Sequence, residues 1–314
     1  MTYLSIIIPV YNEEESLKLL YEQIKKVCSN LSKNYEIIFI DDGSQDGGYK
    51  LLKEIALKDS MVKLVKFRRN FGQTAAISAG IDASQGEIII PLDADLQNDP
   101  ADIPKLLEKL NEDFDVVSGW RKNRQDKFLS RKLPSHLANF LISFITKVKL
   151  HDYGCTLKAY RSEILKDLRI YGEMHRFIPA YAAWRGAQVT EIVVDHHSRK
   201  FGKTKYGISR TLKVILDLLV VKFVIDYSTK SIYFFGGLGL TSVFFGFISG
   251  LIAVYFKLFE GRSFISTPLP LLTALLFLVG IQLIMMGLLS DMILRSYYET
   301  NDKKNYTVKE RINF

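Results

Sequence analysis

The chain has 314 residues, of which 48% are hydrophobic, and a formal net charge of +8. Its length suits one or two domains plus a membrane segment, and its charge suits an anionic membrane surface, a phosphorylated lipid or a nucleotide as partner. Two cysteines, Cys28 and Cys155, do not support a disulfide framework or a zinc site.

The N-terminal part alternates short apolar runs, rich in Ile and Val, with segments of helical spacing. The predicted strands are residues 4–10, 35–41, 62–67, 87–92 and 115–119. The predicted helices between them are residues 14–28, 46–58, 72–83 and 100–110. This alternation predicts an α/β fold with a mostly parallel sheet covered on both faces. Ligands of such sheets bind at the carboxyl ends of the strands.

Two later segments, residues 231–256 and 263–290, contain no Asp, Glu, Lys or Arg. Each exceeds the roughly 20 residues that a helix needs to cross a bilayer. We therefore expect a two-helix transmembrane hairpin within residues 228–296, with spans at about 231–256 and 266–292. Two such runs in tandem disfavour the alternative, which is a pair of buried helices in a soluble protein.

Basic residues flank the outer ends of both apolar segments, which favours a hairpin with both ends in the cytoplasm. The N-terminus has no basic leader before its first apolar run, so we expect no signal peptide. These observations predict a multi-pass protein of the inner or plasma membrane. Its cytoplasmic domain would comprise residues 1–227, and residues 297–314 would form a cytoplasmic tail.

Amphipathic patterns occur near residues 134–150 and 208–225. Helices of this kind can lie in the membrane interface, within the cytoplasmic part of the chain. Packing against the soluble core or a neighbouring subunit is an equal alternative for each. We also expect a homo-oligomer, because these helices and the polar tail offer contacts to neighbouring subunits.

Polar residues gather where three predicted strands end. The first strand runs into Pro9-Val10-Tyr11-Asn12-Glu13, the second into Asp41-Asp42-Gly43-Ser44, and the fourth into Asp93-Ala94-Asp95-Leu96-Gln97. Turn and helix-cap chemistry is the alternative for each cluster, but three acidic clusters at three strand ends favour a ligand site. Carboxylate and amide oxygens there suit Mg²⁺ or Mn²⁺, which would neutralise the charge on a departing nucleoside diphosphate.

No dinucleotide-binding G-x-G-x-x-G follows a strand, and no P-loop occurs. A bound diphosphate would therefore depend on the metal and on basic side chains. The candidates are Arg68, Arg69, Arg121, Arg131, Arg199, Lys203 and Lys205. For each of them a solvated surface position is the alternative.

Taken in order, these motifs are specific to one family. Besides the clusters at the strand ends, they include Arg69-Asn70-Phe71-Gly72 and Asp152-Tyr153-Gly154-Cys155. The chain resembles the inverting family-2 glycosyltransferases of the GT-A fold. It is most similar to their polyprenyl-phosphate branch, which includes dolichyl-phosphate mannose synthase and the bacterial bactoprenol glucosyl transferases. The resemblance covers the soluble part and the membrane hairpin.

The resemblance implies roles for individual residues. The nucleotide-sugar site would comprise Pro9, Tyr11, Glu13, Ile40, Asp42, Asp93, Ala94 and Arg121. The metal, Mg²⁺ or Mn²⁺, would be held by Asp93, Asp95 and Gln97. The acceptor phosphate would be bound by Arg131, Arg199 and Lys205. The catalytic residues would be Asp95, Asp152 and Arg199.

The implied reaction transfers a hexose, with inversion, to a polyprenyl phosphate in the bilayer. UDP-glucose and undecaprenyl phosphate are the leading pair, with GDP-mannose and dolichyl phosphate as the alternative, and no nucleic-acid partner is expected. A phosphate monoester has a second pKa of about 6, so the acceptor oxygen is largely ionised at cytosolic pH. Asp152 would then be a base for the protonated minority or would orient the acceptor and its basic clamp; a turn aspartate is the alternative.

Two other functions are disfavoured. A processive polysaccharide synthase shares the nucleotide motifs, but this chain has no Gln-x-x-Arg-Trp motif and few membrane segments. A non-catalytic lipid-carrier or scaffold subunit would be expected to have lost part of the acidic set, whereas Asp42, Asp93, Asp95 and Asp152 are all present.

Overall fold

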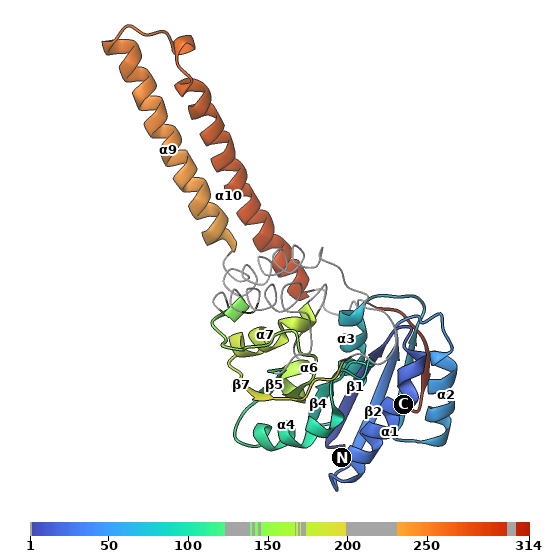
Figure 1. The fold of residues 1–314 in the computed structure, drawn as a ribbon. Helices are drawn as coiled ribbons and strands as arrows, with labels where there is room; N and C mark the ends of the chain where they lie inside the picture. Colours follow the sequence, from blue (N-terminus) through green and yellow to red (C-terminus); the bar gives the residue numbers. More distant parts are fainter. Residues whose placement is uncertain are drawn as a thin grey trace. The chain divides into compact units, whose positions relative to one another are not determined.

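The computed structural model describes residues 2–122, 139, 142–143, 146–166, 168, 170, 174–198, 231–299 and 306–314. It divides into two compact units. The α/β unit comprises Met1–Val221 and Lys304–Phe314, and the second unit, Lys222–Lys303, contains two long helices. The chain therefore leaves the α/β unit once and returns to it at its C-terminal end (Figure 1).

An eight-stranded sheet forms the centre of the α/β unit, in the order β7-β5-β6-β4-β1-β2-β3-β8. The strands are β1 (Leu4–Val10), β2 (Tyr35–Asp41), β3 (Val62–Phe67), β4 (Ile88–Pro91), β5 (Val116–Trp120), β6 (Lys158–Arg161), β7 (Val189–Val193) and β8 (Val308–Ile312). Parallel pairing joins β1 to β2 and β4, β2 to β3, and β5 to β7. Strands β6 and β8 pair antiparallel with their neighbours. The predicted, mostly parallel sheet is confirmed.

Helices cover both faces of this sheet because side chains alternate along its central strands. On β1, Ile6 and Ile8 face one core, and Ile7 faces the other. The first core packs against α1 (Glu14–Ser29), α2 (Gly48–Lys58) and α4 (Ile103–Leu110), which follows the short helix η1 (Pro100–Asp102). The second core packs against α3 (Gln73–Ala83), α6 (Ser162–Lys166) and α7 (Ile178–Trp184), and η3 (Met174–Arg176) precedes α7.

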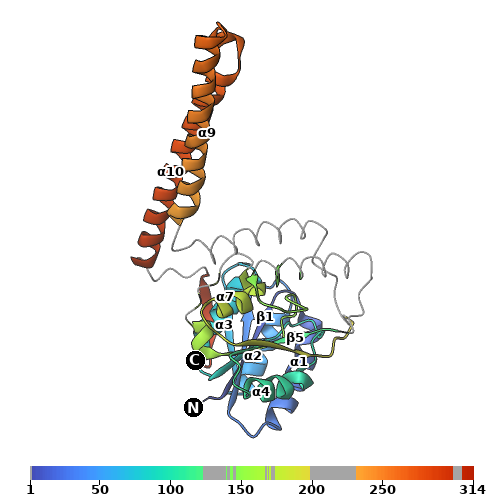
Figure 2. The same ribbon diagram turned by 90° about the vertical axis from the view of Figure 1, so that its left-hand side faces the viewer.

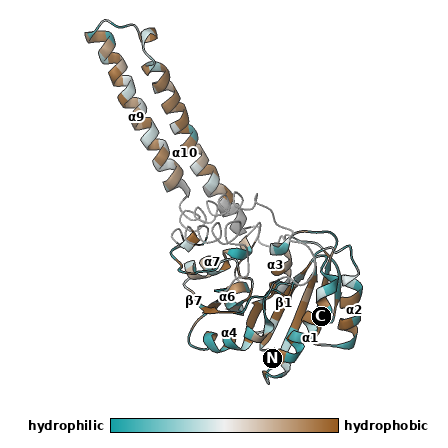
Figure 3. Ribbon diagram, in the orientation of Figure 1, coloured by the Kyte–Doolittle hydropathy of each residue, from teal (hydrophilic) through white to brown (hydrophobic). Residues whose placement is uncertain are grey.

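The second unit is a helical hairpin formed by α9 (Ser231–Phe259) and α10 (Leu269–Glu299), with η4 (Phe264–Ser266) between them. Both helices are long and apolar enough to cross a membrane, over Tyr233–Phe259 and Leu269–Ser290 (Figure 3). The helices pack closely at Gly239 and Gly280. A Cβ atom at Gly239 would lie 2.6 Å from the Gly280 carbonyl oxygen. Small residues allow such close approach in membrane helix pairs.

Several predicted segments differ from the structure or lie outside its described part. The predicted interfacial helix near residues 134–150 is described only in part, and residues 147–150 are not helical. Its counterpart near residues 208–225 lies outside the described residues. Strands β6, β7 and β8 were not predicted. The last of them begins at Val308, within the predicted tail, and pairs with β3 inside the α/β unit (Figure 2).

Candidate active site

The polar clusters of the sequence meet where the parallel strands end, on the side of the sheet formed by their carboxyl ends. We call this side the acidic edge. Strands β1, β2 and β4 are parallel neighbours, so the turns that follow Val10, Asp41 and Pro91 lie at the same edge. Because β6 runs antiparallel to β4 and β5, the segment that precedes Lys158 reaches this edge too. The Asp152 segment is thereby brought to the acidic clusters, although it is far from them in sequence.

The turns after β1 and β2 are joined by hydrogen bonds. The Asn12 amide donates to Ser44 Oγ at 3.1 Å, and the Gln45 amide donates to Asn12 Oδ1 at 2.8 Å. These contacts place the Tyr11 and Glu13 turn beside the Asp41-Asp42 pair. The predicted nucleotide residues of β1 and β2 therefore belong to one surface.

Asp42 is buried and is held by backbone groups of the segment after β3. Its carboxylate accepts hydrogen bonds from the amides of Phe71 at 2.7 Å and Gly72 at 2.9 Å. Burial raises the pKa of Asp42 to about 6, although these two amides oppose the shift. Gly43 has φ +74°, and a Cβ there would lie 2.6 Å from the Arg69 carbonyl carbon. Glycine thus permits the turn after Asp42 to pack against residues 69–72.

Asp93 and Asp95 follow β4 as a pair of carboxylates. Asp93 accepts hydrogen bonds from Gln73 Nε2 at 2.8 Å and from Thr156 Oγ1 at 2.6 Å. Burial, and next to it the charge of Asp95, raises the pKa of Asp93. Leu96 has φ +59°, a left-handed conformation that is uncommon for leucine. Such backbone conformations cluster at functional sites.

This pair fits a divalent cation. Two desolvated carboxylates that repel each other would be stabilised by a cation, and Mg²⁺ is commonly bound by one or two carboxylates together with substrate phosphates. Among the described residues, no group of three or more His, Cys, Asp and Glu side chains is arranged to hold a metal. A pair of carboxylates suits a metal that substrate phosphates help to hold. Gln97 lies two residues beyond Asp95, whose Oδ1 accepts a hydrogen bond from the Gln97 amide.

Arg121 and Asp152, which the sequence assigns to separate roles, form one largely buried ion pair. Arg121 Nε donates to Asp152 Oδ2 at 2.7 Å, and Nη2 donates to Oδ1 at 2.9 Å. The Gly154 amide also donates to Oδ1, at 3.1 Å. Burial alone would lower the pKa of Arg121, but Asp152 outweighs it and the pKa is raised. The carboxylate of Asp152 is thus already neutralised by a fixed guanidinium.

Sequence reasoning missed several side chains that support the site. Lys158 is only 3% exposed, and its ammonium donates to the carbonyl oxygens of Tyr153 and Cys155, which shapes the loop after Asp152. Burial lowers its pKa. Ser16 Oγ donates to the Ala94 carbonyl at 2.6 Å and so fixes α1 to the acidic turn. No local signal indicates Lys158, because it begins β6, a short strand that also contains Arg161.

The remaining predicted residues differ in position. Pro9 is half-buried near the end of β1, and Ala94 lies between the two carboxylates. The Ile40 side chain is fully buried in the core, so only its backbone faces the turn region. Arg131, Arg199 and Lys205, together with Lys203, lie outside the described residues.

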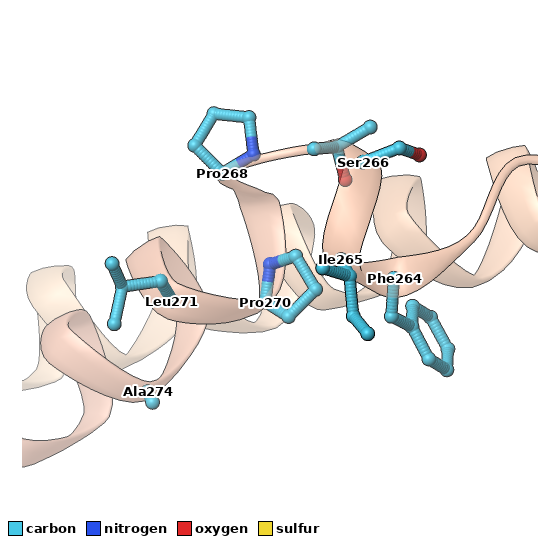
Figure 4. Close-up of a pocket in the computed structure, with 8 residues that line it drawn as sticks. Phe264, Ile265, Ser266, Pro268, Pro270, Leu271 and Ala274 are labelled. Carbon is cyan, nitrogen blue, oxygen red and sulfur yellow. The ribbon is translucent and has the colours of Figure 1, made fainter.

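A hollow of about 760 Å³ lies elsewhere, at the connection between α9 and α10 (Figure 4). Its lining is largely apolar and comprises Phe264, Ile265, Ser266, Thr267, Pro268, Pro270, Leu271 and Ala274. None of the predicted site residues lines it. The acidic edge of the sheet, and not this hollow, is therefore the candidate active site.

Comparison with known proteins identifies the family of the chain. The model of glycosyl transferase family 2 matches residues 5–169, which include every acidic cluster described above. A dodecaprenyl-phosphate galacturonate synthase of Rhizobium johnstonii is 42% identical over 98% of this chain and 92% of its own length. An undecaprenyl-phosphate 4-deoxy-4-formamido-L-arabinose transferase of Aeromonas hydrophila is 37% identical over 98% of this chain and 93% of its own.

Solved structures agree on the fold. A glucosyl-3-phosphoglycerate synthase of Mycobacterium tuberculosis, solved with Mn²⁺, UDP-glucose and phosphoglyceric acid, superposes with a TM-score of 0.53 at 18% identity. The match covers 73% of this chain and 82% of that enzyme, and it supports the GT-A architecture of the α/β unit. From the matched family model, the near-full-length relatives and this fold, the chain belongs to glycosyl transferase family 2.

Proposed function

We propose that this protein transfers a sugar from a nucleotide-sugar to a polyprenyl phosphate at the cytoplasmic face of a membrane. The observation that carries the proposal is full-length similarity to two polyprenyl-phosphate sugar transferases, combined with an intact acidic edge at Asp42, Asp93 and Asp95. The same acidic set argues against a non-catalytic scaffold subunit.

On the donor side, Asp42 and the half-buried turn at Tyr11 and Glu13 would bind the nucleoside. Asp93 and Asp95, with Gln97, would hold Mg²⁺ or Mn²⁺ and the diphosphate. The metal would neutralise negative charge on the departing nucleoside diphosphate. Gln73 and Thr156 would keep Asp93 in one orientation through their hydrogen bonds.

On the acceptor side, an ionised phosphate oxygen would attack the anomeric carbon opposite the leaving diphosphate, which inverts that centre. Arg121 would offer its remaining N–H groups to the donor diphosphate, while Arg131, Arg199 and Lys205 would form the basic clamp for the acceptor phosphate. Of the two roles considered for Asp152, the ion pair favours positioning. Its carboxylate is 3% exposed and both oxygens accept hydrogen bonds, so Asp152 would hold Arg121 rather than accept a proton.

Membrane topology is supported by the return of the chain to the α/β unit. Strand β8 follows both apolar helices and pairs with β3 of the catalytic sheet. A strand can join this sheet only from the same side of a membrane. The outer ends of α9 and α10 would therefore face the compartment that holds the catalytic unit, as the basic flanking residues indicate for the cytoplasm.

The sugar is a separate question. The resemblance to the bacterial enzymes favours glucose, whereas the two relatives are named for galacturonate and 4-deoxy-4-formamido-L-arabinose. We therefore place UDP-galacturonate first among the donors to be tested, with UDP-4-deoxy-4-formamido-L-arabinose, UDP-glucose and GDP-mannose beside it. The expected homo-oligomer stays a prediction, which crosslinking in membranes would test.

The deciding experiment measures transfer of radiolabelled sugar from each donor to undecaprenyl phosphate or dolichyl phosphate in detergent. Reactions contain Mg²⁺, Mn²⁺ or EDTA, with wild type and Asp95→Ala. A metal-dependent single-sugar lipid made by wild type alone supports the proposal. Nucleotide binding without transfer from any donor would instead favour the scaffold function.

A further inference from the structure

The C-terminal segment, residues 306–314, contributes the last strand of the catalytic sheet, beside β3. Its strand β8 pairs with β3 from Leu64 opposite Ile312 to Phe67 opposite Val308, and the Arg68 amide donates to the Thr307 carbonyl at 3.2 Å. An uncovered edge strand leaves a row of backbone groups without partners in the sheet. Because the pairing is antiparallel, the first residues of the segment lie beside the carboxyl end of β3, which is the end that leads into the donor site.

Tyr306 is the residue that joins this segment to the core. It is 8% exposed, and its ring stacks on Phe67 with a centroid distance of 5.1 Å and an interplanar angle of 18°. Its hydroxyl donates to Asp82 Oδ2 at 2.7 Å. One side chain therefore contacts both the last residue of β3 and the last turn of α3.

The same stack continues to the residues that hold Asp42. Phe67 packs edge-on against Phe71, with their centroids 5.6 Å apart. The Phe71 amide is one of the two that donate to the Asp42 carboxylate. A shift of the Phe67 ring would therefore displace Phe71, and with it the backbone that orients Asp42.

The contact of Tyr306 with α3 also connects it to the acidic cluster that contains Asp93. Asp82 is the tenth residue of α3, and Gln73 is its first. Gln73 donates to Asp93 Oδ1. Tyr306 thus contacts β3, which leads into the residues that hold Asp42, and α3, whose first residue holds Asp93.

We infer that the segment after the second apolar helix, through Tyr306, is a positioning element of the nucleotide-sugar site. The inference rests on the proposed function, since it assigns Asp42 and Asp93 to donor binding. It gives residues 306–314 a role in donor affinity. Tyr306 itself would touch neither substrate nor metal.

The test compares two ends of the same segment. Tyr306→Ala removes the contacts beside Phe67, whereas Asn313→Ala removes the hydrogen bonds from Asn313 Nδ2 to the Ala56 and Val62 carbonyls at the far end of β3. Both variants weaken docking of β8, but only the first lies next to the donor site. Tyr306→Phe keeps the stack and removes the hydroxyl.

We expect Tyr306→Ala to weaken binding of UDP or GDP to the full-length protein in detergent by about threefold to tenfold, the range that follows from loss of one aromatic pair. In transfer assays KM for the donor should rise while kcat changes by less than about twofold. Tyr306→Phe should have a smaller effect, and Asn313→Ala should leave nucleotide affinity unchanged. Amide exchange at Phe71 and Gly72 should be faster in Tyr306→Ala alone.

Unchanged amide exchange and nucleotide affinity in folded Tyr306→Ala would overturn the inference, as would an equal loss in Asn313→Ala. If Tyr306→Ala does not fold, Tyr306→Leu and Phe67→Leu disturb the same stack with smaller changes in volume and are judged by the same criteria. Amide exchange needs no substrate. If wild type transferred no sugar, the proposed reaction would be refuted, but amide exchange would still test this inference.

Discussion

Carboxylates on the donor side of the acidic edge accept hydrogen bonds from neutral groups, whereas the carboxylate on the acceptor side pairs with a charged side chain. Asp42 is held by two backbone amides, and Asp93 by an amide side chain and a hydroxyl, all of them neutral donors. Asp152, in contrast, is held by the guanidinium of Arg121. Burial raises the pKa of both donor-side carboxylates, whereas the charge of Asp152 is balanced within the protein.

This contrast separates groups that receive ligands from groups that position other residues. A buried carboxylate whose hydrogen bonds come from neutral groups can gain a further, positively charged ligand, which a metal or a substrate N–H group can supply. A carboxylate in a bidentate arginine pair has little to gain from another ligand. The following predictions test whether the two sides respond to mutation in these two ways.

The largest effect is expected at the metal pair. Asp95→Asn should lower sugar transfer by at least about 10²-fold to 10³-fold, since electrostatic stabilisation of developing charge has this magnitude in enzymes. EDTA should abolish transfer by wild type, and Mg²⁺ or Mn²⁺ should restore it. The measurement is the initial rate of lipid glycosylation.

Asp99→Asn is the matched control for this prediction. Asp99 lies four residues from Asp95, caps η1 through the Ala101 amide and contacts His197 Nε2 at 2.9 Å. Its loss should reduce stability slightly and leave the metal response unchanged. If Asp95→Asn transferred sugar as fast as Asp99→Asn, Asp95 would not belong to the metal site.

The ion pair gives the next largest effect. Arg121→Met and Asp152→Asn should each destabilise the fold by about 3–5 kcal/mol, because each leaves one buried partner without its counterpart. The double variant should be less destabilised than the sum of the two single variants. Denaturant unfolding of the four proteins measures this coupling.

Transfer rates of the same four proteins, together with Arg121→Lys as a fifth, distinguish the two roles of Asp152. If it positions Arg121, both single variants lose similar activity and the double variant loses little more. If it is a base, Asp152→Asn loses far more activity than Arg121→Lys, which keeps the positive charge. The second pattern would refute positioning.

Asp42 should produce a pH dependence of about tenfold. Burial raises its pKa to about 6 from 3.8, so the free energy of unfolding falls as pH rises through this window, where the folded state keeps a proton that the unfolded state releases. Nucleotide-sugar affinity should change in the other direction. It should fall about tenfold from pH 7 to pH 5 as the carboxylate gains its proton.

Asp42→Asn should bind the donor weakly, and both dependences should be weaker between pH 4 and pH 7, with the remainder due to the raised pKa of Asp93. Calorimetric titration with an intact nucleotide-sugar avoids the ionisation of a terminal phosphate. Donor affinity that is constant over this range in wild type would mean that Asp42 does not bind the nucleoside in its charged form.

Local patterns predicted the parallel half of the fold closely. Strands β1, β2 and β3 have the predicted bounds, since short runs rich in apolar residues between polar turns are typical of buried parallel strands. Strands β6, β7 and β8 were missed because their burial depends on partners distant in sequence. Val308–Ile312 has three consecutive charged residues between its terminal Val and Ile, and only its pairing with β3 makes it part of the sheet.

The candidate site, like the fold, was predicted only in part. Acidic motifs at strand ends identified Asp42, Asp93 and Asp95, because carboxyl ends of parallel strands meet at one edge. The pairing of Arg121 with Asp152 depends on the antiparallel strand β6, which no local pattern predicted. Lys158, Thr156 and Tyr306 could not be found from the sequence for the same reason.

The smallest effect is expected at Thr156, which supports a ligand without being one. Thr156→Val keeps the shape of the side chain and removes the hydrogen bond to Asp93 Oδ2, which is worth about 1 kcal/mol. The metal concentration for half-maximal transfer should rise about fivefold, with little change in rate at saturating metal. Thr156→Ser should restore the wild-type value. A metal response that is identical in the valine and serine variants would show that Gln73 alone orients Asp93, and the donor side would then depend on fewer neutral contacts than its structure indicates.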